Sequence, residues 1–139
     1  MSHAKPCPSM TVGLGIDVID VARIRGSCER FGDRFLRRVL RDTEVAYCQG
    51  LVDPAPSVAA RFAAKEAVSK AFGTGIGSEL GWHDIEILRL PTGQPTIRLH
   101  GLGVVLLAKL GGNCVHISLT HTREYAAAVA IIERVGVVE

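Results

Sequence analysis

The sequence predicts an α+β fold in which an antiparallel sheet carries a long helix packed on it. Three patterns indicate this class: a glycine-lined N-terminal strand, a long alanine-rich helix, and two hairpins in the second half of the chain. Strands that can pair as antiparallel neighbours, with helices on one side, are typical of α+β proteins. A length of 139 residues indicates one domain, expected at 11–139 after a disordered lead of residues 1–10.

Residues 11–19 are expected to form the first strand. Apolar side chains at the even positions alternate with Gly13, Gly15 and Asp17, which is the period of two of a strand. Glycine weakens a strand, so its repetition indicates that something approaches this backbone closely. One face of the strand is therefore apolar, and the other is nearly bare and carries an acid.

The next region is expected to be helical over residues 20–40, with a break near Gly26 or Gly32 and Asp20 as the N-cap. A second helix is expected from Thr43 to Gly50. The long helix then runs from an N-cap at Ser57 to Phe72. Gly73 follows as the residue that ends it. Alanines at every fourth position form a small-residue stripe that permits close packing against a sheet: Ala59, Ala63, Ala67 and Ala71.

The second half of the chain reads as two hairpins separated by a short apolar helix. The expected strands are 84–90, 96–100, 114–120 and 125–133, and the expected helix is 102–110. The last hairpin is scarcely polar on either side. We expect one apolar face to comprise Val115, Ile117, Leu119, Ala127, Val129 and Ile131, and the other to carry Ala126, Ala128, Ala130 and Ile132. A sheet apolar on both sides must be covered on both sides, which predicts contacts between subunits.

Residues 61–77 contain the densest group of candidate functional side chains. Lys65, Glu66 and Lys70 lie on the alanine-rich helix, and Glu66 and Lys70 share a face because they are four residues apart. Glu66 and Asp17 are candidate ligands of Mg²⁺, which prefers carboxylate, phosphate and water oxygens. Two simpler interpretations stay open: Asp17 as a helix cap, and Glu66 as a surface acid paired with Lys70.

The glycine run at 73–77 is not a P-loop, because it lacks Gly-Lys-Ser/Thr and follows a helix. Gly73 is explained by helix termination, whereas Gly75 is not, and the amides of the run are candidates for an anion-binding nest. His116 and His121 lie on or just after a strand and do not match a zinc motif. A single histidine in such a place is more often structural than catalytic.

Composition and charge exclude several functions. A net charge of +2 is too small to indicate nucleic-acid binding. No apolar run is long enough to cross a membrane, and residues 1–10 lack the apolar core of a signal peptide. The four cysteines form no CxxC pair and read as free thiols in a reducing compartment, so a cytoplasmic location is expected. Residues 23–41 hold seven arginines against two acids, which predicts recognition of carboxylates or phosphates.

Together these segments resemble holo-acyl-carrier-protein synthase, the short, trimeric class of 4′-phosphopantetheinyl transferase. The combination of Lys-Glu-Ala-x-x-Lys-Ala at 65–71 with the upstream Gly-x-Asp at 15–17 carries most of the resemblance. The other matching segments keep the family's order along nearly the whole chain from Thr11: residues 61–64, 72–73, 84–87, 93–95, 116–121 and 125–129. The lead of ten residues lies outside the family pattern.

The resemblance implies Mg²⁺-dependent transfer of the phosphopantetheine arm of coenzyme A to a serine of acyl carrier protein, releasing adenosine 3′,5′-bisphosphate. It implies Asp17 and Glu66 as metal ligands and Lys70 as the phosphate-neutralising amine, with these three forming the catalytic set. It implies coenzyme A contacts from Lys65, Lys70, Gly73, Gly75 and His121, and carrier-protein contacts from Arg23, Arg30, Phe31 and Arg34. Some relatives carry an acid after the histidine matching His121, where this chain has Thr122.

Two alternative functions stay open. The first is a non-catalytic subunit of the same fold that binds coenzyme A or a carrier protein. The second is a transferase that serves a polyketide-type carrier protein. Retention of both Asp17 and Glu66 favours an enzyme, because binding alone does not require two metal ligands.

Overall fold

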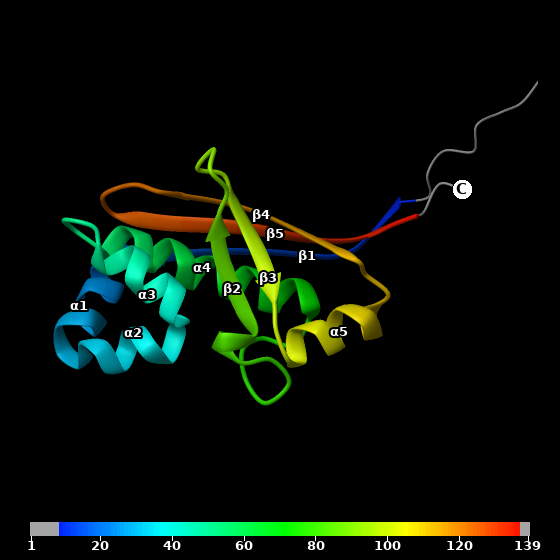
Figure 1. Cartoon of the computed structure of the whole chain (residues 1–139), viewed down its shortest axis with the longest axis horizontal. Coiled ribbons are helices and arrows are strands. Elements are labelled where there is room, and N and C mark those ends of the chain that lie inside the picture. The colour runs from blue at the N-terminus through cyan, green and yellow to red at the C-terminus, as the bar shows by residue number, and fades with distance from the viewer. Residues whose placement is uncertain (1–8, 137–139) are drawn as a thin grey trace, which may run out of the picture.

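The computed structural model describes residues 9–136 and confirms the α+β class (Figure 1). Its main sheet has three antiparallel strands in the order β1 (Ser9–Asp20), β5 (Tyr125–Val135) and β4 (Cys114–His121). The helix α4 (Ala55–Phe72) runs along one face of this sheet. The remaining elements are α1 (Val21–Phe31), α2 (Asp33–Val39), α3 (Asp42–Gln49), the short 3-10 helix η1 (Trp82–Asp84), β2 (Ile85–Arg89), β3 (Pro95–Leu99) and α5 (Leu102–Leu110).

Figure 1 shows how these elements surround α4. Helices α1, α2 and α3 gather at one end of the molecule, and α5 lies at the other end. The antiparallel hairpin of β2 and β3 is a separate sheet on the helix-bearing side of β1, β5 and β4. The other face of the three-stranded sheet carries no helix among the residues that the structure describes.

Several predicted boundaries are corrected by the structure. Ser9 and Met10 pair with Val135 and Arg134, so the part of the expected lead that is described belongs to β1; residues 1–8 lie outside the described range. The predicted helical region breaks at Gly32, whose φ of 55° favours glycine. The long helix begins at Ala55 after Pro54, and Ser57 is a buried residue inside its first turn instead of the N-cap. Gly73 ends α4 in the left-handed conformation, as predicted.

The glycines of β1 face α4, which explains the close approach that their repetition predicted. A Cβ atom at Gly15 would collide with the backbone oxygen of Ala67, and one at Gly13 would collide with that of Ala71. The alanine stripe of α4 therefore lies directly on the backbone of β1. This contact brings Asp17, on the same face of β1, beside the helix.

The predicted faces of the last hairpin need correction. Residues opposite each other across two strands share a face, and Ile117 pairs with Ala130 while Leu119 pairs with Ala128. Val115, Ile117 and Leu119 therefore lie on the α4 face with the buried Ala126, Ala128, Ala130 and Ile132, and not with Val129 and Ile131. The sequence pattern gave the alternation correctly, but it does not determine how two strands pair.

The outward face of the sheet is nevertheless apolar. Leu14, Ile16 and Val18 are each about two-thirds exposed there, at 65%, 67% and 65%. Ala127, Val129 and Ile131 lie beside them on β5. An apolar patch of this kind is typical of a surface that contacts another protein.

No helix within residues 9–136 combines the length and the apolar character that a membrane span requires.

Candidate active site

Asp17 and Lys70 form the centre of the candidate site. The ammonium of Lys70 donates a hydrogen bond of 2.9 Å to Oδ1 of Asp17 and one of 3.0 Å to the backbone oxygen of Ile16. The Asp17 side chain is only 17% exposed, whereas that of Lys70 is 52% exposed. The pair therefore opens to solvent through the amine, with the carboxylate held at the base.

Glu66 completes this group one helical turn before Lys70. Partial burial raises the pKa of the Glu66 carboxyl, and the negative charge of Asp17 raises it further. Lys70 and Arg23 oppose this shift by favouring the charged form. The mutual influence of these four side chains identifies them as one electrostatic cluster at the junction of α1, β1 and α4.

The local sequence explains why these side chains meet. Glu66 and Lys70 are presented from consecutive turns of α4, as their spacing predicted. Asp17 follows Gly13 and Gly15 on the face of β1 that contacts α4, and the bare glycines let the helix come close enough for a direct ion pair. The structure brings the three predicted catalytic residues together. Asp20 makes no side-chain cap at the start of α1.

The donor set fits a magnesium ion. Within residues 9–136, no group of three or more His, Cys, Asp or Glu side chains is arranged to hold a metal. The cluster offers two carboxylates instead, Asp17 and Glu66, whose like charges disfavour each other in the absence of a cation. Mg²⁺ is commonly held by one or two carboxylates together with substrate phosphates and water. Asp17 and Glu66 are therefore suited to a metal that arrives with a phosphate ligand.

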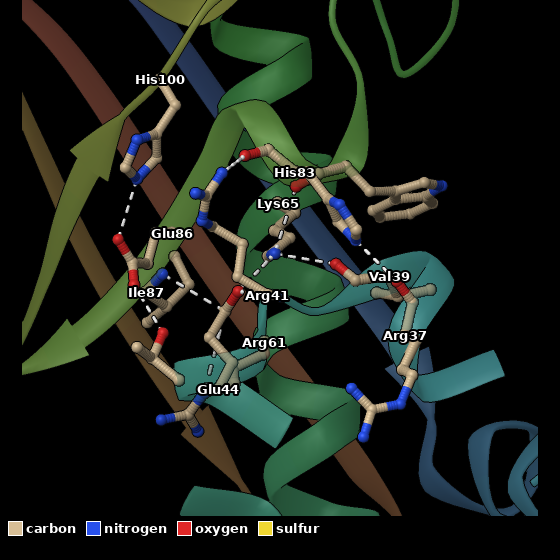
Figure 2. A network of polar contacts seen from close by, with 12 residues as sticks. Arg37, Val39, Arg41, Glu44, Arg61, Lys65, His83, Glu86, Ile87 and His100 are labelled. Atoms are coloured by element: carbon tan, nitrogen blue, oxygen red, sulfur yellow. Dashed lines mark hydrogen bonds and ion pairs between the residues drawn. The ribbon is translucent and has the colours of Figure 1, made fainter. Parts of the chain in front are cut away.

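Lys65, by contrast, lies in the core. Its side chain is 0% exposed, and its ammonium donates hydrogen bonds to Glu44, the backbone oxygen of Val39 and the backbone oxygen of Trp82 (Figure 2). All three protons of the amine have acceptors within the protein. This placement argues against the predicted contact between Lys65 and coenzyme A.

The glycine loop after α4 uses its amides internally. The amide of Gly73 donates to the oxygen of Lys70, and the amides of Thr74 and Gly75 donate to that of Ser69. These amides therefore do not form the anion-binding nest that the sequence suggested. Gly75 has a φ of 66°, which accounts for a glycine there as the helix cap accounts for Gly73. Any contact of this loop with coenzyme A would use other atoms.

His121 lies across the sheet from the cluster. It is exposed at the end of β4 and pairs with Ala126, which in turn pairs with Ile19. Two strand spacings, about 10 Å, separate β4 from β1. A single chain thus places His121 apart from Asp17, Glu66 and Lys70. His116 lies on the outward face, with its Nε2 3.2 Å from the Cys114 sulfur.

The arginine-rich segment divides into two groups. Arg25 forms a bidentate pair with Asp53, Arg37 binds Asp42, and Arg41 donates to the backbone oxygen of His83. Among the residues that the structure describes, no carboxylate pairs with the other four: Arg23, Arg30, Arg34 and Arg38. The unpaired group is the one that can meet an acidic partner.

The surface formed by α1 and α2 combines these charges with an exposed aromatic ring. Phe31 is 48% exposed, and the guanidinium of Arg30 lies 5.1 Å from the centre of its ring. A hollow of about 310 Å³ beside it is lined by Ser27, Phe31, Arg34, Phe35 and Arg38. Phe35 and Arg38 line this hollow although the sequence does not single them out as candidates. The i,i+4 spacings from Phe31 to Phe35 and from Arg34 to Arg38 are the signal that places them on the same faces as the predicted residues.

Comparisons with known proteins identify the family of the chain. The sequence model of the 4′-phosphopantetheinyl transferase superfamily matches residues 13–130. The chain belongs to the 4′-phosphopantetheinyl transferase superfamily. The matched region of this superfamily member contains Asp17, Glu66, Lys70 and His121, and it ends just before the last residues of β5.

Individual superfamily members match over almost their full length. The holo-[acyl-carrier-protein] synthase of Koribacter versatilis is 47% identical over 124 residues, which cover 89% of this chain and 99% of that protein. The synthase of Chlamydia trachomatis serovar L2 is 49% identical over 121 residues, 87% of this chain and 98% of its own. The crystal structure of the Helicobacter pylori synthase in complex with coenzyme A has a TM-score of 0.77 and 35% identity, covering 86% and 98%.

Proposed function

We propose that this protein transfers the 4′-phosphopantetheine arm of coenzyme A to a serine of apo acyl carrier protein and releases adenosine 3′,5′-bisphosphate. The observation that carries the proposal is the cluster of Asp17, Glu66 and Lys70, found within a chain of this superfamily. Relatives named as holo-[acyl-carrier-protein] synthase, one of them in complex with coenzyme A, support the choice of both substrates.

Asp17 and Glu66 would hold the Mg²⁺ ion, which supplies neutralisation of charge on the pyrophosphate of coenzyme A when bound. Lys70 supplies a further positive charge at the mouth of the site, where its half-exposed amine can turn from Asp17 toward a phosphate oxygen. In the reaction, the serine oxygen forms a bond to the β-phosphorus, and the bond from that phosphorus to the oxygen of the departing adenosine 3′,5′-bisphosphate breaks.

Glu66 is suited to receive the proton that the serine hydroxyl loses. Its carboxylate lies in the same cluster as Asp17 and Lys70, so it could take this proton directly or through an intervening water. Its position beside Lys70 and Asp17 puts this base within the cluster that binds the phosphates. The two roles proposed for Glu66, as ligand and as proton acceptor, both follow from its place in this cluster.

The acidic carrier protein would dock on the surface of α1 and α2, through Arg23, Arg30, Phe31 and Arg34. Arg23 links this surface to the catalytic cluster, because its charge acts on the pKa of Glu66. A carrier bound along the arginines would therefore present its serine close to the reacting phosphate. A transferase serving a polyketide-type carrier would use the same surface, so the two carriers are distinguished by assay.

The working unit in this proposal is a homotrimer in the cytoplasm. The outward apolar face around Leu14, Ile16 and Val129 is the surface that a second copy would cover. The number three rests on the resemblance to the short class of the family. His121 lies across the sheet from the cluster of its own chain. In the trimer, His121 of one subunit would meet the cluster of a neighbouring subunit around one coenzyme A.

Release of adenosine 3′,5′-bisphosphate tests the proposal against the non-catalytic alternative. Purified protein is incubated with coenzyme A, Mg²⁺ and either apo acyl carrier protein or apo polyketide-type carrier, and the nucleotide product is quantified by chromatography. We expect product only when a carrier is present, and more of it with acyl carrier protein. A protein that binds both substrates and releases no nucleotide would be a binding subunit.

A further inference from the structure

We propose that Lys65 and Glu44 form a positioning pair that fixes the rotation of α4 and so holds Glu66 toward Asp17. The inference rests on the proposed function, and it gives Lys65 a role that the sequence did not predict. Neither residue of the pair reaches solvent, so neither can touch a substrate.

Lys65 ties α4 to three other elements at one point (Figure 2). Its ammonium donates 2.7 Å to Oε1 of Glu44 on α3, 2.8 Å to the oxygen of Val39 at the end of α2, and 3.2 Å to the oxygen of Trp82 in η1. An ammonium has three donors, and these three acceptors fix their directions. The end of the side chain therefore has a single orientation.

Glu44 is held in place independently of Lys65. Its Oε1 also accepts a hydrogen bond of 2.9 Å from the backbone amide of Arg41, and its Oε2 accepts one of 3.3 Å from that of Ile87. The guanidinium of Arg61, one turn before Lys65, lies 3.9 Å from Oε2. Glu44 thus joins α3 and β2 into a fixed frame, and Lys65 attaches α4 to that frame.

The face of α4 that meets β1 is held differently. There the helix meets β1 through Ala67 and Ala71, which lie on the backbone of Gly13 and Gly15. Small side chains permit a close approach but do not interlock. The long side chain that reaches β1 is Lys70, and in the proposed function its half-exposed amine turns from Asp17 toward a phosphate. The glycine contact therefore sets the distance between helix and sheet, and the buried Lys65 contact is the tie that still sets the angle about the helix axis when Lys70 binds substrate.

This angle determines where Glu66 points. Neighbouring residues of an α-helix are separated by about 100° around its axis, because a turn contains 3.6 residues. With Lys65 directed at Glu44, Glu66 shares a face of α4 with Lys70, four residues further on, and Lys70 contacts Asp17 on β1. A small rotation of α4 would move the Glu66 carboxylate away from Asp17 and change the distance between the two metal ligands.

A purely structural role makes a different prediction. A buried ion pair is weak support for stability, because its replacement by apolar residues of similar volume is often neutral or stabilising. If Lys65 and Glu44 served stability alone, an apolar pair would preserve both fold and activity. If they position Glu66, an apolar pair would preserve the fold and lose activity, because methyl groups do not impose a direction as hydrogen bonds do.

The test compares the double variant Lys65→Met/Glu44→Leu with Glu44→Gln, which keeps an oxygen acceptor for Lys65. Three quantities are measured: the thermal midpoint, kcat with KM for each substrate, and the affinity of the coenzyme A complex for Mn²⁺, read by electron paramagnetic resonance in the absence of carrier. The exposed Asp53→Asn variant, which breaks the ion pair to Arg25, serves as the control for loss of a salt bridge.

We expect the double variant to fold with a lower thermal midpoint, because the amides of Arg41 and Ile87 and the guanidinium of Arg61 lose their acceptor. Its kcat should be about 10- to 100-fold lower and its Mn²⁺ affinity about tenfold weaker, with an unchanged KM for the carrier. Glu44→Gln should melt lower yet keep most of its kcat. A double variant whose kcat and Mn²⁺ affinity equal those of the unmodified protein would overturn the inference.

If the double variant does not fold, Lys65→Met measured on its folded fraction at low temperature decides the same question. If the unmodified protein releases no product, the proposed function fails while the Mn²⁺ comparison still tests the pair.

Discussion

The ammonium of Lys70 lies 2.9 Å from Oδ1 of Asp17, across an interface made of glycine and alanine. This contact joins two residues that are 53 positions apart in the chain. It exists because β1 has no side chains at Gly13 and Gly15, so α4 can lie directly on the strand. The cluster of Asp17, Glu66 and Lys70 therefore depends on close packing as much as on the charged residues themselves.

Gly15→Ala should test this dependence on packing. The new methyl group would collide with the backbone oxygen of Ala67, and overpacking of this kind costs about 1–3 kcal/mol of unfolding free energy. The midpoint of denaturant unfolding should fall, and turnover should fall with it because α4 is displaced from Asp17. Gly26→Ala is the matched control: its Cβ meets nothing within 4 Å, and in the interior of α1 it should add about 0.5–1 kcal/mol. Equal stability of the two variants would contradict the account.

Glu66→Gln should lose turnover and gain stability near neutral pH. Burial and Asp17 raise the pKa of Glu66, so the folded state holds this proton more tightly than the unfolded chain does. Stability from the protonated form is present at low pH and is lost as pH rises through the raised pKa. The glutamine side chain of the variant cannot ionise and so does not lose this stability. The variant should therefore melt at a higher temperature than the unmodified protein at pH 7 without metal.

The gain should vanish below about pH 4.3, the ordinary pKa of glutamate, where the carboxyl is protonated in both states. Thermal melts over a pH series, with the exposed Glu79→Gln as control, provide the measurement. A Glu66→Gln variant that is less stable than the unmodified protein at pH 7 would mean that the surroundings do not disfavour the charged carboxylate of Glu66.

Arg30→Glu and Arg34→Glu should each raise KM for the carrier protein several-fold and leave KM for coenzyme A nearly unchanged. Both side chains are exposed on α1 and α2 without a carboxylate partner among the described residues. The effect should shrink with added salt, because exposed charges are screened over roughly 8–10 Å at moderate ionic strength. Arg134→Glu, at the far end of β5, is the control. Equal changes in both KM values would exclude the docking role.

Leu14→Glu and Ala128→Glu should have different consequences. Leu14 is 65% exposed on the outward face of the sheet, so a charge there should separate the subunits and leave a folded, inactive monomer. Ala128 is buried against α4, so an unpaired charge there should unfold the chain itself. Sedimentation and circular dichroism distinguish the outcomes. An unmodified protein that sediments as a fully active monomer at micromolar concentration would refute the trimer.

Particular residues show how far the sequence predicts the structure. The sequence predicts where Glu66, Lys70 and Asp17 lie because local patterns carry them: helical spacing for the first two, and a glycine-lined strand for the third. Gly73 was predicted to end α4 because left-handed backbone favours glycine. Helix α5 was predicted with its observed bounds because its apolar residues lie between glycines.

Lys65 and the last hairpin show what the local pattern does not contain. The residues that flank Lys65 in the sequence do not distinguish it from a surface lysine. It is buried only because α3 packs against it. Glu44 has one local signal, its spacing of three from Arg41, whose amide it caps. The faces of β4 depend on its register with β5, in which Ile117 pairs with Ala130 and Leu119 with Ala128. These features arise from contacts between distant segments.

The most direct test of the account is the mass of the carrier protein. Apo acyl carrier protein, coenzyme A and Mg²⁺ are incubated with the unmodified protein, with Asp17→Asn, or with Glu66→Gln, and the intact carrier is weighed by mass spectrometry. We expect the unmodified protein to add one phosphopantetheine arm per carrier, at the serine that accepts it, and both variants to fold yet convert almost none in the same time. A carrier of unchanged mass with the unmodified protein, or full conversion by either variant, would contradict the central claim.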